Sequence, residues 1–367
     1  MKNNRILWIC NHTTLMDVEC RLLQKLGFEV FVPKVLGDNR SSAISHEFDK
    51  SLTVPADVLH ALNQFDFYHD EWSPNIAAMV NKYFDVAFCV NVYPAIFNVA
   101  KSFNGKVVLR AFGYESNINY EQTTACTRKI HGIRHLCKPQ DIVRDNEMMR
   151  QLHKIKNRFY LGVAYRQIIP NETPFFQKRS VFLPLGMPQS IWKNENTWVG
   201  GGDKIMFVCP SIENPYYKGI YDSFKQQFGD LPHLIFGVQN HKYPNDKSII
   251  GFLERSKFDN YMQTLPVMFY HSTEPRHLHY HPLEAICYGM PVVFMGGGIL
   301  QDFGGANQPG LCHTVADAHD KLTRILNGDA ELVANILSRQ KKILNEVSDD
   351  FILNAWKENF TLVTGNN

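Results

Sequence analysis

The feature that most restricts the fold of this chain is a regular alternation of short apolar runs with segments of helical periodicity. The runs at 5–10, 28–33 and 86–90 predict buried strands, and 15–26 predicts an amphipathic helix that ends at Gly27. Strands that alternate with helices in this way build parallel sheets. The sequence therefore predicts an α/β protein.

The alternation runs in two series, which indicates two domains. A polar stretch ending in Gly200-Gly201-Gly202 interrupts it, and it resumes at 204–209. We expect one Rossmann-like domain over 1–190 and a second over 203–345, because 367 residues suffice for two separate cores. The segment 346–367 predicts a helix with an apolar stripe and no strand after it. We expect this C-terminal helix to cross back and dock on the first domain.

Composition and charge exclude several classes of protein. Lys and Arg number 38 and Asp and Glu 36, so no overall positive field exists to hold nucleic acid. No run approaches the roughly 18–20 apolar residues that span a bilayer, and the apolar run after the basic start is too short for a signal peptide. The eight cysteines are scattered singly and are typical of buried thiols. We therefore expect a cytoplasmic protein with no nucleic-acid partner.

The most informative segment of the second half is 272–294. A polar loop leaves a strand, a short helix begins near Pro282, and Gly289 closes that helix before the next strand. Glu284 would then lie in the first turn of the helix, where a carboxylate can accept hydrogen bonds from both hydroxyls of a ribose. The alternative is that Glu284 only complements the helix dipole.

This segment carries a resemblance to a known family. Leu283-Glu284-Ala285 followed by Gly289-Met-Pro-Val-Val293 resembles the LEAxxxGxPVV segment of retaining GT-B glycosyltransferases of family 4. Lys218-Gly219 resembles the family's lysine-glycine element, whose lysine contacts the phosphates of the donor. The strand edge at Gly251 and Phe252 resembles the edge that packs on the nucleotide base.

The resemblance implies a GT-B fold, with two Rossmann-like domains facing across a cleft. It also implies that the second domain binds a nucleotide-diphosphate sugar, which is a donor substrate and not a resident cofactor. The first domain would bind a glycan or lipid-linked glycan acceptor. The expected activity is metal-independent hexosyl transfer to a hydroxyl, of the kind used in cell-surface polysaccharide biosynthesis.

Two departures from the family pattern affect the donor site. The family has a glutamate eight residues before Glu284, where this chain has Arg276. Glu274 lies two residues further away, so either the loop has grown or the role of the first glutamate is lost. The family's arginine before the lysine-glycine element is also missing. These departures leave open whether the reaction retains or inverts configuration.

The charge of the diphosphate then needs other partners. We expect Lys218 and Arg276 to contact it, together with the backbone N–H groups of Gly296 and Gly297, which follow a strand as an anion-binding turn would. The alternative for these glycines is a simple flexible turn.

Four histidines, His271, His277, His279 and His281, crowd the loop before Glu284. Alternating imidazoles can bind zinc, but no cysteine or second ligand cluster accompanies them and the chain has no Asp-x-Asp triplet. We therefore expect no metal. His277 and His279 are the candidates for hydrogen bonds to the diphosphate or the transferred sugar.

Polar residues also follow strands in the first half. His12, oriented by Asp17, could act as a general base on an acceptor hydroxyl; the alternative is that His12 only lines the cleft. Arg110, Tyr114 and Glu115 are further acceptor-side candidates.

Three questions stay open at this stage. The basic segment 128–158, with Met148, Leu152 and Ile155 at helical spacing, could rest on the inner face of a membrane, or it could be a solvated helix packed on the core. The same scaffold could serve a nucleotide-sugar epimerase. It could also serve a non-catalytic two-domain sugar-binding protein.

Overall fold

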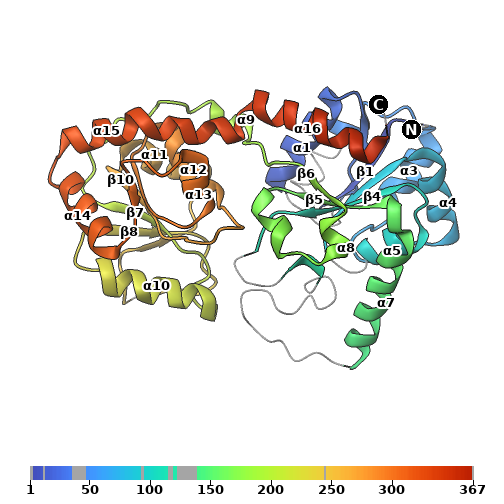
Figure 1. Ribbon diagram of the computed structural model, residues 1–367, viewed down its shortest axis with the longest axis horizontal. Helices are drawn as coiled ribbons and strands as arrows, with labels where there is room; N and C mark the ends of the chain where they lie inside the picture. Colours follow the sequence, from blue (N-terminus) through green and yellow to red (C-terminus); the bar gives the residue numbers. More distant parts are fainter. Residues whose placement is uncertain are drawn as a thin grey trace. The chain divides into compact units, whose positions relative to one another are not determined.

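The computed structural model describes residues 3–10, 13–34, 47–91, 95–114, 119–121, 139–243 and 245–365. The chain forms two compact units, Met1–Pro188 with Asp349–Asn367 and Gln189–Ser348 (Figure 1). Each unit is built on a six-stranded parallel sheet, so the predicted α/β class with two Rossmann-like halves is confirmed. None of the helices in the described ranges is long and apolar enough to cross a bilayer.

The sheet of the first unit has the strand order β2-β1-β3-β4-β5-β6, and all of its pairings are parallel. From β1 the chain crosses to β2 on one side of that strand and later to β3 on its other side. Because such crossover connections are right-handed, helices cover both faces of the sheet. Burial on both faces explains why the strands are almost uninterrupted apolar runs. The strands are β1 (Arg5–Ile9), β2 (Glu29–Phe31), β3 (Val86–Cys89), β4 (Lys106–Ala111), β5 (Phe159–Val163) and β6 (Ser180–Phe182). The helices are α1 (Thr13–Lys25), α3 (Ala56–Gln64), α4 (Pro74–Tyr83), α5 (Ala95–Ser102), α7 (Pro139–Ile155), α8 (Pro174–Gln177) and α16 (Asp349–Thr364).

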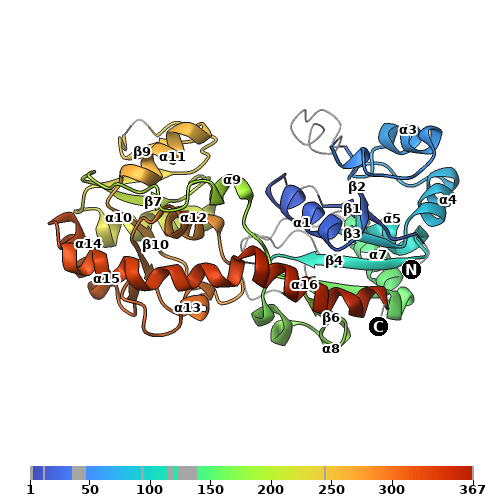
Figure 2. The same ribbon diagram turned by 90° about the horizontal axis from the view of Figure 1, so that it is seen from above.

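The C-terminal helix α16 packs on the first unit, as predicted, and runs beside β6 (Figure 2). Its residue Trp356 is fully buried, and the indole Nε1 donates a hydrogen bond to the carbonyl oxygen of Pro184 at 2.9 Å. The ring of Trp356 also stacks on Phe88, with 6.1 Å between ring centroids. Because its apolar stripe faces the core, this helix completes the first unit although it comes last in the sequence.

Arg110 at the end of β4 is an interior residue of the first unit. Its guanidinium group pairs with Glu19 of α1, and the exposed fractions of the two side chains are 0% and 1%. It also donates to the carbonyl oxygens of Gly162, at 2.6 Å, and Leu183, at 3.0 Å. These bonds join α1 to two strand ends, so Arg110 acts in the core and not, as the sequence indicated, on an acceptor.

The sheet of the second unit has the order β12-β11-β10-β7-β8-β9, again with parallel pairings. Its core is a cluster of buried aromatic and aliphatic side chains in which Phe207 stacks on Phe224, with 3.9 Å between ring centroids. The strands are β7 (Ile205–Val208), β8 (His233–Phe236), β9 (Ile249–Gly251), β10 (Val267–Tyr270), β11 (Val292–Met295) and β12 (Leu311–Cys312). The helices are α9 (Gln189–Trp192), α10 (Pro215–Phe228), α11 (Arg255–Thr264), α12 (Tyr280–Tyr288), α13 (Ile299–Gly304), α14 (Val315–Leu326) and α15 (Ala330–Gln340).

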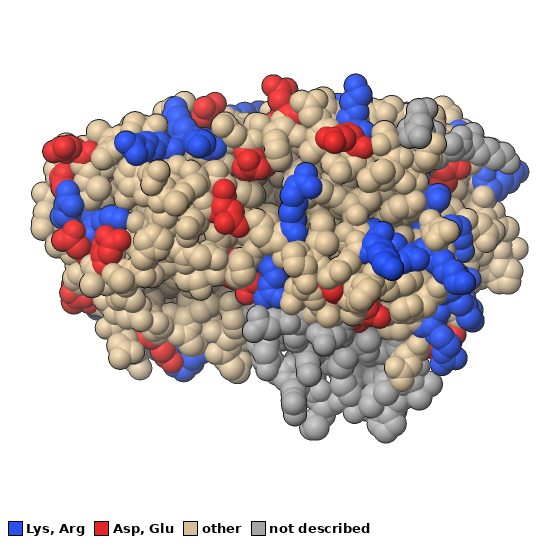
Figure 3. All heavy atoms as spheres, in the orientation of Figure 1, with Lys and Arg blue, Asp and Glu red and all other residues tan. Residues whose placement is uncertain are grey.

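The apolar stripe of the basic segment 128–158 belongs to α7. Met148, Leu152 and Ile155 of α7 are buried, so the apolar stripe of that helix packs on the core. Residues 128–138, the first part of the basic segment, lie outside the described ranges. On the face seen in Figure 3, basic side chains gather on the part of the first unit around α7, whereas basic and acidic side chains are interspersed over the second unit.

Candidate functional site

The candidate site lies at the carboxyl edge of the second sheet. In open parallel sheets, ligands bind beyond the carboxyl ends of the strands. The loops that follow β10 and β11 meet there, because a Cβ atom on Gly298 would lie 3.0 Å from the carbonyl oxygen of Ser272 and 3.3 Å from that of Glu274. Most of the donor-side residues predicted from the sequence therefore belong to this edge or to the helices beside it.

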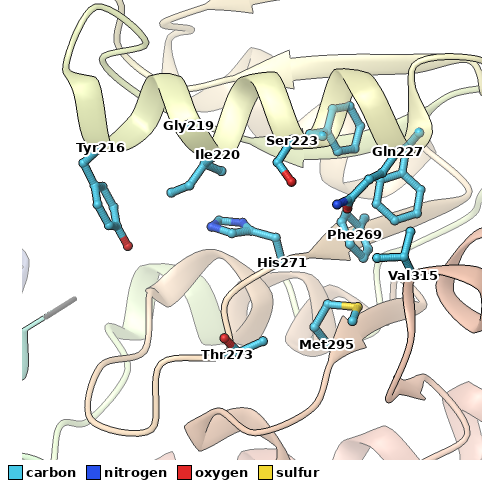
Figure 4. A pocket seen from close by; sticks show the side chains of 12 residues that line it. Tyr216, Gly219, Ile220, Ser223, Gln227, Phe269, His271, Thr273, Met295 and Val315 are labelled. Carbon is cyan, nitrogen blue, oxygen red and sulfur yellow. The ribbon is translucent and has the colours of Figure 1, made fainter. Parts of the chain in front are cut away.

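A pocket of about 380 Å³ opens between α10 and the ends of β10 and β11. One wall is the inner face of α10, and the other comes from β10, β11 and the start of α14 (Figure 4). Figure 4 shows the ring of His271 projecting into the middle of the space. The lining residues are Tyr216, Gly219, Ile220, Ser223, Phe224, Gln227, Phe228, Phe269, His271, Thr273, Met295 and Val315.

The pocket combines apolar walls with polar groups that have no hydrogen-bond partner among the described residues. Phe228 and Phe269 pack together at its base, with 4.6 Å between ring centroids. The side chains of Ser223, Gln227 and Thr273 make no hydrogen bond to any other described residue. A mostly apolar cavity with a few convergent polar groups is typical of a small-molecule site.

Glu284 lies in α12, which begins at Tyr280 and not near Pro282. The first N–H groups of a helix have no partner within it, so a proline at the third position costs no hydrogen bond. Glu284 therefore occupies the second turn of the helix, and the prediction of a first-turn position is wrong. The predicted stop is confirmed, because Gly289 ends the helix with φ 89° in the left-handed region.

Arg255, the first residue of α11, is the ionic partner of Glu284. Its Nη1 lies 3.0 Å from Oε2 of Glu284, its Nε lies 2.6 Å from Asp259, and its Nη2 donates to the Tyr288 hydroxyl at 3.0 Å. The Glu284 side chain is 12% exposed. Burial raises the pKa of the Glu284 carboxyl, and the adjacent Arg255 guanidinium opposes that rise. The result is an oriented carboxylate that a ligand can still reach.

Lys218 lies on the side of α10 that faces away from the pocket. With 3.6 residues per turn, it projects opposite the lining residues Tyr216, Ser223 and Gln227. Its ammonium group lies 2.7 Å from both carboxylate oxygens of Asp222, and both side chains are more than half exposed. Contact between Lys218 and a phosphate therefore requires the ammonium group to leave Asp222.

Glu274 and Arg276 pair with each other in the loop after β10. Oε1 of Glu274 accepts hydrogen bonds from the backbone N and the Nε of Arg276, at 3.2 and 2.9 Å. Both side chains are largely buried, with exposed fractions of 17% and 11%. The arginine predicted for the diphosphate is thus neutralised within its own loop.

The glycine turn after β11 uses its amide groups within the protein. The N–H of Gly296 donates to the carbonyl oxygen of Cys312 at 2.8 Å, and the N–H of Gly297 donates to the side-chain oxygen of Gln301 at 2.8 Å. Gly297 has φ 93°, which favours glycine. These bonds favour the turn interpretation over the anion-binding one.

The edge at β9 exposes an aromatic ring. Gly251 has φ 76°, and Phe252 after it is 67% exposed. Val238, which follows the neighbouring strand β8, is 51% exposed. Two exposed apolar side chains that follow neighbouring strands offer apolar surface on which a planar ring can pack.

The histidines of the loop form a ring cluster beside Tyr270. His277 lies 4.6 Å from His279, and His279 lies 5.2 Å from His281, measured between ring centroids. The Tyr270 hydroxyl is 3.3 Å from Nδ1 of His279. Within the described residues, no group of three His, Cys, Asp or Glu side chains is arranged to hold a metal ion. Bonding of His277 and His279 to a donor stays a prediction.

The predicted acceptor-side residues are only partly described. His12 and Glu115 lie outside the described residues. Asp17, on α1, pairs with Arg21 one turn along the helix at 2.5 Å. The Tyr114 hydroxyl accepts a hydrogen bond from the side-chain nitrogen of Asn91 at 2.5 Å. The proposed pairing of His12 with Asp17 therefore stays a prediction.

The sequence analysis missed Arg255 and the polar residues that line the pocket. No spacing rule links Arg255 to Glu284, which lies on the next helix along the chain. The pocket did leave a signal, because Ser223 and Gln227 are polar residues on the face of α10 that also carries Ile220 and Phe224. A polar interruption of a core-facing stripe indicates a cavity or a ligand.

Two six-stranded parallel sheets with a C-terminal helix packed on the first unit define the GT-B glycosyltransferase fold. Solved structures match the chain over its whole length. The glycosyltransferase from Rickettsia africae ESF-5 matches with a TM-score of 0.61, 14% identity and 100% of both chains covered. HepE (Alr3699) from Anabaena, solved in complex with UDP-glucose, matches with a TM-score of 0.58, 11% identity and coverage of 99% of this chain and 100% of its own.

The O-GlcNAc transferase from Thermobaculum terrenum matches with a TM-score of 0.57 and 13% identity, over 99% of this chain and 69% of its own. No protein-family model and no curated protein sequence matches the chain. At these identities the likeness shows the fold.

Proposed function

We propose that the protein is a glycosyltransferase that takes a hexosyl group from a uridine-diphosphate sugar. The acceptor is a hydroxyl group of a glycan or glycolipid of the cell-surface polysaccharide type. The GT-B fold supports the proposal, as does the complex of the similarly folded HepE with UDP-glucose. The family 4 resemblance of the segment around Glu284 supports it independently of the fold.

The observation that carries the proposal is Glu284 itself. It is a largely buried, ion-paired carboxylate at the edge of the sheet where a nucleotide is expected. In the proposed complex, Glu284 accepts hydrogen bonds from the ribose hydroxyls. Phe252, beside Gly251, packs on the base. Lys218 and Arg276 exchange their present carboxylate partners for the diphosphate.

The chemistry is a substitution at the anomeric carbon of the sugar. The acceptor oxygen forms a bond to that carbon while the bond to the diphosphate oxygen breaks, and the acceptor proton passes to a base. Positioning of the two substrates and stabilisation of the departing diphosphate supply most of the rate. If the reaction inverts configuration, His12 with Asp17 is the proposed base.

The test measures binding and turnover with UDP-, GDP-, ADP- and CMP-sugars by calorimetry and NMR, with and without EDTA. UDP-sugars should bind and be slowly hydrolysed in the absence of an acceptor. Formation of an epimer would instead indicate an epimerase. A folded protein that neither binds nor turns over any of these donors would refute the proposal.

A matched pair of variants locates the site. Glu284→Gln removes the charge of the proposed ribose ligand and should weaken UDP binding by at least about tenfold, the scale of one hydrogen bond to a charged group. Glu254→Gln makes the same change at an exposed position before α11 and should leave binding unchanged. Equal effects of the two variants would contradict the assignment of Glu284.

A further inference from the structure

The pocket beside α10 has no fixed charge in its lining. None of its twelve lining residues is Lys, Arg, Asp or Glu, and His271 is its one imidazole. The lining mixes hydroxyl and amide groups from α10 and from the loop after β10 with aromatic and aliphatic side chains (Figure 4). Such a site suits a neutral ligand with both hydroxyl groups and apolar surface.

Charged residues close to the pocket in sequence are turned away or already paired. Lys218 and Asp222 bind each other on the other side of α10. Glu274 and Arg276 form a largely buried ion pair in the loop that continues from Thr273. In the proposed complex, Lys218 and Arg276 would be engaged by the diphosphate, so a carboxylate that enters the pocket would lose its hydration without gaining an ionic partner.

The dimensions of the pocket favour one sugar ring. A volume of about 380 Å³ lies near the lower end of the roughly 300–1,000 Å³ range of small-molecule pockets. The side chains of Ser223, Gln227 and Thr273 have no hydrogen-bond partner in the described part of the chain, so their polar groups are available to a ligand. Sugar hydroxyls can use these groups, while the apolar face of the ring packs on the aromatic wall.

We propose that this pocket receives the transferred sugar of the donor and selects neutral hexoses and N-acetylhexosamines over hexuronic acids. The inference rests on the proposed function and adds the class of sugar to it. The physical reason is the cost of burying a carboxylate that has no cation beside it. Ser223, Gln227, His271 and Thr273 are then the residues that determine specificity.

The experiment compares UDP-glucose, UDP-N-acetylglucosamine and UDP-glucuronate at pH 8, where an ordinary imidazole is neutral. Binding and acceptor-free hydrolysis are both measured, with UDP alone as the reference. The two neutral donors should be hydrolysed with kcat/KM at least about 100-fold above that of UDP-glucuronate, because the carboxylate must enter the pocket unpaired.

Variants give the pocket a positive charge. Ser223→Arg should raise the kcat/KM for UDP-glucuronate by about tenfold or more and lower that for UDP-glucose, since a guanidinium group pairs well with a carboxylate. Gln226→Arg places the same charge on an exposed part of α10 outside the pocket and should leave the preference unchanged. Thr273→Lys repeats the test from the loop if the helix variant does not fold.

The outcomes separate this inference from the proposed function. If UDP-glucuronate is used as well as UDP-glucose, or if the pocket variants do not change the preference, the sugar lies elsewhere and the inference is overturned alone. If no UDP-sugar binds, the proposed function is overturned together with it.

Discussion

Replacement of Arg255 by glutamine tests how Glu284 is prepared for its ligand. Arg255 lies between two carboxylates, at 3.0 Å from Glu284 and 2.6 Å from Asp259, and it is about half exposed. The variant removes the positive charge that opposes the burial effect on Glu284, so the pKa of the Glu284 carboxyl should rise further above its ordinary value. Because a ribose hydroxyl needs an ionised acceptor, UDP affinity should fall.

The magnitude follows from the contact and its exposure. A hydrogen bond to a charged group contributes about 1.5–3 kcal/mol, and the exposure of Arg255 reduces its effect to roughly 1–1.5 kcal/mol. This corresponds to a rise of about five- to tenfold in the Kd for UDP. A carboxyl with a raised pKa loses its charge as pH falls through that pKa, and in the variant this happens at higher pH. The gap between wild type and variant should therefore widen towards pH 6 and narrow towards pH 9.

Calorimetric titration of UDP at pH 6, 7, 8 and 9 measures this gap. Lys257→Gln removes one positive charge from the exposed side of the same helix and serves as the control for overall electrostatics. Arg255→Lys keeps the charge and should retain most of the pH profile. A loss of affinity of the same size at every pH, or a matching loss in Lys257→Gln, would refute the coupling of Arg255 to Glu284.

Two further predictions concern separate parts of the molecule. Phe252→Ala removes an exposed ring and should raise the Kd for UDP about fivefold, which corresponds to about 1 kcal/mol of stacking. The melting temperature should not fall. An unchanged Kd would place the base elsewhere. Arg110→Met leaves the Glu19 carboxylate buried without its cation and should reduce the free energy of unfolding by about 3–5 kcal/mol, measured in urea through tryptophan fluorescence. Replacing Glu19 by leucine as well should recover most of that loss, and equal stability of the single variant and wild type would contradict the core role of Arg110.

The strands and the terminal helix were the most predictable parts of the fold. The strands Arg5–Ile9 and Val86–Cys89 lie within one residue of the predicted runs 5–10 and 86–90, and the helix Asp349–Thr364 lies inside the predicted 346–367, because burial makes each a distinct apolar pattern. The strand Leu311–Cys312 was missed, since two residues are too few to form a pattern. The start of α12 was misplaced because Pro282 is tolerated inside the first turn of a helix.

The site was predictable only where a single segment carries it. The segment around Glu284 and Gly289 has a recognisable order of residues, and it could be found without coordinates. The pocket and the ion pair with Arg255 arise from contacts between segments far apart in the chain, and no periodicity encodes such contacts. For Lys218 the sequence could not indicate its pairing with Asp222 or its position on the side of α10 away from the pocket, and its contact with a phosphate stays a prediction.

Two of the arginine–glutamate pairs of this protein, Arg110–Glu19 and Arg255–Glu284, show what separates a structural ion pair from one that can serve a site. Arg110 and Glu19 are 0% and 1% exposed, and the arginine also donates to two backbone carbonyls. No ligand can reach that carboxylate, so the ion pair contributes only to the stability of the fold. Arg255 and Glu284 are 49% and 12% exposed, which leaves a desolvated but reachable carboxylate. Both pairs consist of the same two residue types, so residual exposure, which the sequence does not encode, decides which of the two carboxylates a ligand can reach.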